Sequence, residues 1–201
     1  MSSSLAPTCR RESSQNLYRI LAFVGCNELR PRAACHCKIK FVSPSAKKLD
    51  EGLQILAGLW TEDPFSFAGE YYTVDQVTFL TKPVQSPRIP LWVVAGWPHH
   101  APFRRAARWD GVCVKAIHHQ TYEWMTVDAF REAFSYVQAR CAPGKPFEVI
   151  MSGQTPRDQQ EAGEKVRPFE QAGATWWVEV GYGLTFEEFR ERIRRGPPRL
   201  L

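Results

Sequence analysis

The sequence lacks several features that would assign it to a common functional class. No run of 18 or more apolar residues occurs in its 201 residues, so we expect no membrane-spanning helix. Residues 1–11 contain Ser, Pro and Arg without the apolar stretch of a secretory signal, which favours a cytoplasmic protein. A phosphate-cradling Lys-Ser/Thr loop and a Gly-x-Ser-x-Gly nucleophile elbow are also missing.

Metal-binding patterns are equally scarce. Cys35-His36-Cys37 lacks the usual gap between paired ligands, and no second pair follows it. His99-His100 and His118-His119 are neighbours that do not share a ligand direction, and no acidic residue stands at a suitable spacing. We therefore expect no metal site and interpret these histidines as loop residues. The six cysteines are expected to stay reduced, and Cys113 lies in an apolar run typical of a core.

The basic balance, a net charge of +5, does not predict nucleic acid as a partner. The arginines are spread over several predicted helices, and no ribbon of aromatic and basic residues accompanies them. Two clusters are interpreted as solvated helix faces, with attraction of a phosphate as the alternative for the first. They are Arg104, Arg105 and Arg108, and then Arg190, Arg192, Arg194 and Arg195.

The composition changes near residue 44. Residues 1–44 show little periodicity, and we expect this segment to be poorly ordered. Residues 45–201 form the folded domain. Ser43-Pro44 is a good helix start, and the helix should end before Pro64. Aromatic and β-branched residues among turn residues over 65–79 then predict a short antiparallel hairpin.

From Pro90 onward, strands and helices alternate. Each predicted strand is followed by a predicted helix, which implies parallel βα units. The sequence leaves open whether they form an open doubly wound sheet or part of a closed barrel. No Gly-x-Gly-x-x-Gly turn follows any strand, which weakens a dinucleotide-binding interpretation. The predicted strands cover residues 91–95, 111–114, 147–151 and 175–180. Later helices are predicted to begin at Thr126, at Thr155-Pro156 and at a capping box opened by Thr185, the last with Phe186, Phe189 and Ile193 inward.

The chemistry of such folds lies in the loops after the strands. Ala95-Gly96 permits close approach of the backbone to a ligand, and a helix begins soon afterwards, which favours an anion. Trp177 and Glu179 alternate with Trp176 and Val178, so one pair faces inward. An inward Glu179 would act as a general acid or base, whereas the alternative is a Glu paired with an Arg at the rim.

Four segments in a fixed order carry a family resemblance. They are Lys48–Leu56 with Leu59-Trp60, Phe67–Tyr72, the Pro-x-Gln-x-Pro lead of Lys82–Val93, and the Ala-Ala-x-x-Asp-Gly turn of Ala106–Val112. In this order and spacing they resemble the bacterial luciferase-like flavin-dependent monooxygenases, from about residue 46 to the end of the chain. The resemblance implies an α/β fold, a partial (β/α)8 TIM-type barrel of about four C-terminal βα units with a short β-hairpin insertion.

The resemblance also implies a function. Family members use reduced FMN, or a deazaflavin coenzyme of the F-420 type, to reduce or oxygenate small organic substrates. Ala95, Gly96 and Trp97 would lie where the family holds the cofactor phosphate, and no catalytic residue is assigned. We therefore expect a flavin-dependent oxidoreductase or monooxygenase with a small-molecule substrate.

The N-terminal segment departs from the family. Residues 1–44 do not read as four further βα units, and a complete barrel needs about 250 residues. We expect a truncated chain whose activity is doubtful. The alternative is a non-catalytic half-barrel that self-associates, as a homo-oligomer or with another subunit, through its unpaired edges.

Overall fold

The computed structural model describes residues 44–116, 125–181 and 183–197. The predictions for residues 1–43, including Cys35-His36-Cys37, lie outside these ranges, as do those for His118-His119. Within the described ranges, no helix combines the length and apolar character needed to cross a membrane.

The first described elements are a helix and a hairpin, as predicted. Helix α1 (Pro44–Thr61) is followed by the antiparallel strands β1 (Phe65–Ala68) and β2 (Thr73–Val77). The Glu51 carboxylate accepts hydrogen bonds from the backbone N–H groups of Glu70, Tyr71 and Tyr72 at 2.8–3.3 Å. A helix carboxylate thus satisfies the donors of the hairpin turn, which ties the hairpin to α1.

A four-stranded parallel sheet follows, in which spatial order repeats chain order. The strands are β3 (Trp92–Trp97), β4 (Gly111–Ala116), β5 (Glu148–Gly153) and β6 (Trp176–Glu179). The helices after them are α2 (His100–Ala106), α3 (Val127–Gln138), α4 (Gln159–Gln171) and α5 (Phe186–Arg195). The predicted α/β fold of four βα units preceded by a hairpin is confirmed.

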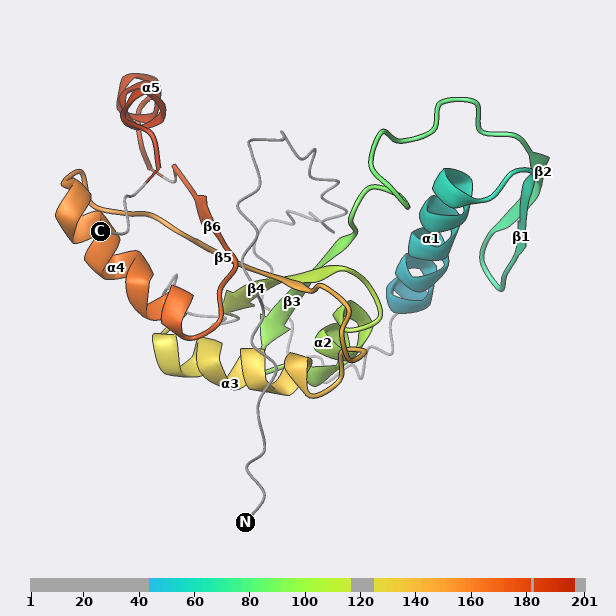
Figure 1. The fold of residues 1–201 in the computed structure, drawn as a ribbon, viewed down its shortest axis with the longest axis horizontal. Coiled ribbons are helices and arrows are strands. Elements are labelled where there is room, and N and C mark those ends of the chain that lie inside the picture. The colour runs from blue at the N-terminus through green and yellow to red at the C-terminus, as the bar shows by residue number, and fades with distance from the viewer. Residues whose placement is uncertain (1–43, 117–124, 182, 198–201) are drawn as a thin grey trace, which may run out of the picture.

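Helix placement distinguishes the two topologies that the sequence left open. Helices α2, α3 and α4 lie on one side of the sheet (Figure 1). Their buried side chains join those of the strands in a single core, for example Phe103 and Phe130 against Val112 and Val114. A doubly wound sheet carries helices on both faces and reverses its strand order. Sequential strands with helices on one side are the arrangement of a barrel segment.

Two tryptophans show that the sheet is curved. Strands β3 and β6 are the first and last of four, about 14 Å apart in a flat sheet by the usual strand spacing. The indole rings of Trp92 and Trp176 nevertheless approach to 5.5 Å between centroids. Both side chains lie on the face opposite the helices, so that face is concave, as the interior of a barrel is.

Asp110 secures the amino-terminal end of the sheet. Its carboxylate accepts hydrogen bonds from Arg88 at 2.5 Å and from the Leu91 N–H at 2.8 Å, and Lys145 lies 3.2 Å away. Burial alone would raise the pKa of Asp110, but these bonds and charges outweigh burial and hold the pKa below its usual value. The Asp-Gly turn into β4 is thus held by ion pairs at this end.

Two local predictions were wrong. Helix α4 is capped by Asp158, whose side chain accepts from the N–H groups of Gln160 and Glu161, and not opened by Thr155-Pro156. Thr155 is engaged with Glu179 instead. In α5 the capping box at Thr185 is present, but Phe186, Phe189 and Ile193 are 76%, 40% and 65% exposed and not inward. The helix stands off from the sheet (Figure 1), so its apolar side is uncovered within the described residues.

Candidate functional site

The concave face of the sheet is built by every second residue of each strand. Successive residues of a strand point to opposite faces of the sheet. Val93, Val112, Val149 and Trp177 pack in the core on the helix side, so their strand neighbours lie on the concave face. The concave face consists of Trp92, Val94 and Gly96 of β3, Gly111, Cys113 and Lys115 of β4, Glu148, Ile150 and Ser152 of β5, and Trp176 and Val178 of β6.

The amino-terminal half of the concave face is filled by aromatic rings. Gly111 leaves room for Trp92, since a Cβ at Gly111 would lie 2.7 Å from the indole Cδ1. Trp176 donates from its indole Nε1 to the Glu148 carboxylate at 3.0 Å and meets Trp92 over the sheet. The two indoles therefore occupy the amino-terminal half of the concave face.

The carboxyl half of the same face is polar. The Lys115 Nζ donates to the Ser152 Oγ at 2.5 Å. Gly96 is in register with Lys115, and Val178 is in register with Ser152, so these four residues form one layer across the sheet. Below it, burial raises the pKa of the Cys113 thiol, although the charge of Lys115 acts in the opposite direction. Cys113 is thus a neutral thiol under a cation.

The three residues predicted to hold a cofactor phosphate lie at the carboxyl end of β3. Ala95 is 1% exposed and its methyl group faces the helices. Trp97 also faces the helices, where its ring packs edge-on against Phe103 at 5.5 Å. Gly96 is buried and is the residue of the three whose Cα faces the concave side. Phosphate binding at Ala95, Gly96 and Trp97 remains a prediction.

The arginines of α2 are engaged elsewhere. Arg105 and Arg108 both pair with Asp50 of α1, at 2.7 and 2.6 Å. The Arg104 guanidinium lies 3.4 Å from the Tyr136 hydroxyl. These side chains line a shallow depression between α1 and α2, away from the carboxyl ends of the strands.

Glu179 is paired with an arginine, as one of the two interpretations expected. Its carboxylate accepts from the Thr155 N–H at 2.7 Å, the Thr155 hydroxyl at 3.1 Å and the Trp177 indole at 2.9 Å, and it pairs with Arg192. Burial, together with the charges of Arg195 and Arg157, lowers the pKa of Arg192. With every oxygen engaged, Glu179 holds β6, the β5–α4 loop and α5 together.

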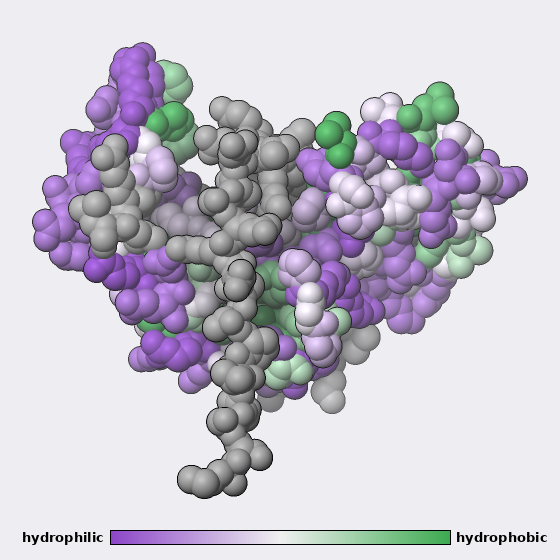
Figure 2. Space-filling model, in the orientation of Figure 1, coloured by the Kyte–Doolittle hydropathy of each residue, from purple (hydrophilic) through white to green (hydrophobic). Residues whose placement is uncertain are grey.

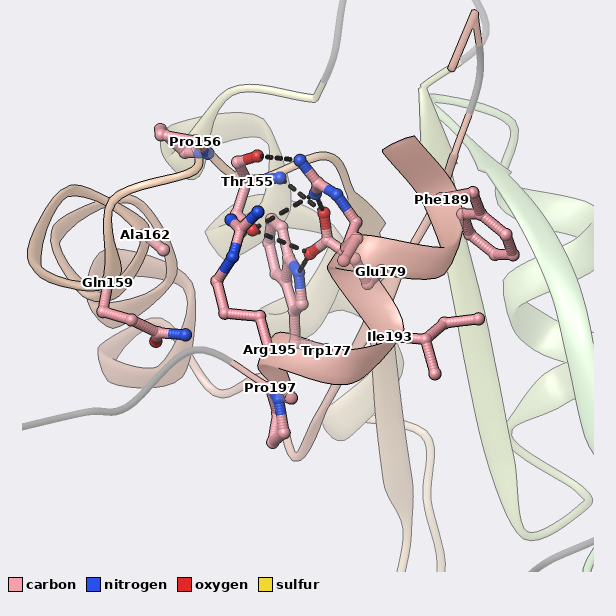
Figure 3. A pocket seen from close by; sticks show the side chains of 12 residues that line it. Thr155, Pro156, Gln159, Ala162, Trp177, Glu179, Phe189, Ile193, Arg195 and Pro197 are labelled. Carbon is pink, nitrogen blue, oxygen red and sulfur yellow. Dashed lines mark hydrogen bonds and ion pairs between the residues drawn. The ribbon is translucent and has the colours of Figure 1, made fainter. Parts of the chain in front are cut away.

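A pocket of about 280 Å³ adjoins this cluster (Figure 3). It lies on the helix side of the sheet, between α4 and α5, and its lining includes Pro156, Trp177, Phe189 and Ile193. Among its polar side chains, Glu179 and Arg192 are bonded to each other, and Arg195 donates to the Arg157 carbonyl. The pocket is therefore separate from the concave face. In the described parts of the chain, no three His, Cys, Asp or Glu side chains group as metal ligands.

Comparison with protein families decides the relationship. The family model for luciferase-like monooxygenases matches residues 44–197. The chain belongs to the luciferase-like monooxygenase family. The match covers the hairpin and all four βα units, so the predicted resemblance is confirmed over the segments that carried it.

Curated relatives of this luciferase-like chain match shorter stretches. Uncharacterized proteins of Mycobacterium tuberculosis and Mycobacterium bovis are 40% identical over 65 residues, 32% of this chain and 21% of theirs. An F420-dependent glucose-6-phosphate dehydrogenase of Kineococcus radiotolerans is 28% identical over 85 residues, 42% of this chain and 25% of that protein. The matches thus span a quarter or less of the relatives' length.

One solved structure is also similar. It is an F420-dependent secondary alcohol dehydrogenase in complex with an F420-acetone adduct, with a TM-score of 0.47 and 17% identity. The alignment covers 67% of this luciferase-like chain and 55% of that one.

Sequence reasoning missed Lys115 and Ser152. The predicted strand ends at residue 114, whereas β4 continues through Lys115 to Ala116. The available signal was its place two residues after Cys113, on the face opposite Val112 and Val114. A charged residue at that position of a parallel strand faces the barrel interior and not the helices.

Proposed function

We propose that this chain contributes the cofactor-binding carboxyl half of a flavin- or deazaflavin-dependent oxidoreductase acting on a small organic substrate. The observation that carries the proposal is the layer of Gly96, Lys115, Ser152 and Val178 at the carboxyl ends of four curved parallel strands. Ligands of barrel enzymes bind at this end of the strands. The indole rings that occupy the amino-terminal half of the concave face support the same location.

The residues present fit such a cofactor. A flavin or deazaflavin coenzyme carries a phosphate, and the layer offers an ammonium, a hydroxyl and the main chain of Gly96 as partners for it. Val94, 38% exposed, and Trp176, 39% exposed, offer apolar surface beside them for a ring system. A bound coenzyme of this kind would supply hydride transfer, while the chain would bind and orient it.

A deazaflavin of the F420 type is favoured over FMN. The named curated relative carries F420 in its description. Oxygen then need not take part, because reduction or oxidation of an alcohol or sugar requires only hydride transfer. The expected chemistry is therefore dehydrogenase or reductase chemistry, with oxygenation as the FMN alternative.

Titration of the full chain with F420 and with FMN, followed by fluorescence, tests the proposal. Val94→Trp fills the centre of the concave face and should abolish binding without loss of folding, because the site is partly exposed. Val84→Trp, at a position 96% exposed in the connection before β3, is the matched control and should bind as the parent does. Absence of binding by the parent chain to both coenzymes would refute the proposal for this chain.

A second candidate is self-association. The apolar side of α5 is uncovered in the described part of the chain, and Figure 2 shows apolar groups at this end of the molecule. An exposed patch of this kind favours association. Light scattering should then give a discrete dimer that Phe186→Ser with Ile193→Ser converts to monomer; a monomeric parent chain would exclude this candidate.

A further inference from the structure

Lys115 occupies an unusual electrostatic position on the concave face. It is half-buried at the carboxyl end of β4, on the side of the sheet opposite α2, α3 and α4. Its one described hydrogen bond is to the Ser152 hydroxyl, a neutral group, at 2.5 Å. Within the described residues, no carboxylate lies at ion-pair distance from Lys115 Nζ, whereas Arg88, Arg105 and Arg192 of similar burial each pair with one.

A half-buried ammonium without a counter-charge is costly. Burial removes part of its hydration, and a hydroxyl dipole stabilises the charge less than a carboxylate would. The residues around Lys115 therefore leave a positive charge that an incoming anion can neutralise. The Ser152 hydroxyl can rotate to donate to the same anion, because a serine both donates and accepts.

The neighbours of Lys115 in the layer bring no second charge. Gly96 is its register partner on β3 and has no side chain to project over the layer. On the other side, Val178 pairs with Ser152 and is apolar. Within this layer, Lys115 is therefore the one charged side chain, beside a hydroxyl and an apolar side chain.

The geometry points to Lys115, with Ser152, as the binding site for an anionic group, a phosphate or a carboxylate, of the ligand on the concave face. This inference deepens the proposed function, on which the identity of the ligand rests. The anion comes either from the coenzyme phosphate or from an acidic substrate, and the chemistry at Lys115 is the same in both cases.

Binding constants of four compounds separate these sources. They are F420, its phosphate-free deazaflavin chromophore, FMN and riboflavin, each measured by fluorescence with the full chain. Lys115→Gln should weaken the binding of F420 or FMN by about tenfold to a hundredfold, which is the range for the loss of one hydrogen bond to a charged group. Lys115→Arg should retain most of the affinity. An unchanged affinity for the phosphate-free compounds then assigns the anion to the coenzyme.

Inorganic phosphate, titrated by calorimetry at constant ionic strength, provides an arm that does not depend on a coenzyme. The parent chain should bind phosphate, and Lys115→Gln should lose it. If the coenzymes bind both proteins equally but phosphate binding is lost, the anion belongs to the substrate. If the parent binds no coenzyme, the proposed function fails, while loss of phosphate binding in Lys115→Gln still supports the anion site.

Two further variants serve as a control for loss of charge and as a second test of the site. Lys165→Gln removes the same charge from the outer side of α4, where Lys165 donates to the Gln154 carbonyl, and should leave every binding constant unchanged. Ser152→Ala should weaken binding of the anion by about threefold to tenfold. It replaces Lys115→Gln as the test if thermal unfolding shows that Lys115→Gln does not fold cooperatively. Equal binding of phosphate and coenzymes by the parent, Lys115→Gln and Ser152→Ala overturns the inference, as does a parent chain that binds no phosphate and no coenzyme.

Discussion

The two faces of the parallel sheet differ in burial and in charge. On the helix side, Val112, Val114 and Phe130 are completely buried in one apolar core. On the concave side, Val94 and Trp176 remain 38% and 39% exposed, and Lys115 carries a charge without a carboxylate partner among the described residues. The first face holds the fold together, whereas the second leaves surface and charge unsatisfied. This division is typical of barrels, in which the ligand end is separate from the stabilising core.

The largest expected effect lies in the helix-side core. Phe130 of α3 is 0% exposed and packs edge-on against Phe169 at 5.6 Å. Phe130→Ala should lower the free energy of unfolding by about 3–5 kcal/mol, because it leaves a cavity that close-packed neighbours cannot fill. Urea denaturation measures the loss. Phe186→Ala, at a residue 76% exposed on α5, is the control and should change stability by about 0.5 kcal/mol or less.

Adjacent tryptophans of β6 compare the two faces directly. Trp177 packs against Phe169 on the helix side and donates to Glu179, whereas Trp176 lies on the concave side. Trp177→Ala should cost about 3 kcal/mol and Trp176→Ala about 1 kcal/mol, since the second ring is already partly in water. Equal losses in the two variants would mean that both faces of β6 are core, and the distinction between them would fail.

Local sequence signals predicted the elements that follow local rules. The helix start at Pro44, the Thr126 cap and the Thr185 capping box all reappear, because each depends on residues within one helical turn. The same logic failed at Thr155. Its hydroxyl is used by Glu179, 24 residues away, and that competition is invisible to a local pattern.

The candidate site was predicted less completely than the fold. Ala95-Gly96 is visible in the sequence as the end of a strand, but the layer around Gly96 is assembled from β4, β5 and β6, whose relative register no local motif encodes. The inward orientation of Phe186, Phe189 and Ile193 failed for a related reason. Helical periodicity identifies an apolar side, but whether that side is covered depends on what packs against it.

Low pH should remove the stabilisation that the ion pairs of Asp110 give to the amino-terminal end of the sheet. The pKa of Asp110 is lowered in the folded chain, so its contribution is present above the ordinary aspartate value of about 3.9 and is lost as the pH falls through the folded value. Asp110→Asn should lower unfolding free energy by about 1–3 kcal/mol at pH 7. The difference from the parent should shrink below about pH 4. Urea midpoints at several pH values measure both.

Asp128 provides the control for that pH dependence. Its side chain is 88% exposed and pairs only with Arg131 three residues along α3. Asp128→Asn should change stability by about 0.5 kcal/mol or less at every pH. A gap between the parent and Asp110→Asn that stays constant from pH 7 to about pH 3 would show that Asp110 acts through its shape and not its charge.

The smallest expected effect on stability belongs to Lys115. Lys115→Gln removes a half-buried charge whose partner in the described part of the chain is a hydroxyl, so unfolding free energy should change by about 0.5 kcal/mol or less, or rise. Arg105→Gln is the contrast, because it breaks a half-buried pair with Asp50 and should cost about 1 kcal/mol or more. Equal costs for the two variants would make Lys115 a structural cation like Arg105. A neutral Lys115→Gln would mean that the ammonium is kept for what it binds, because folding alone gains nothing from it.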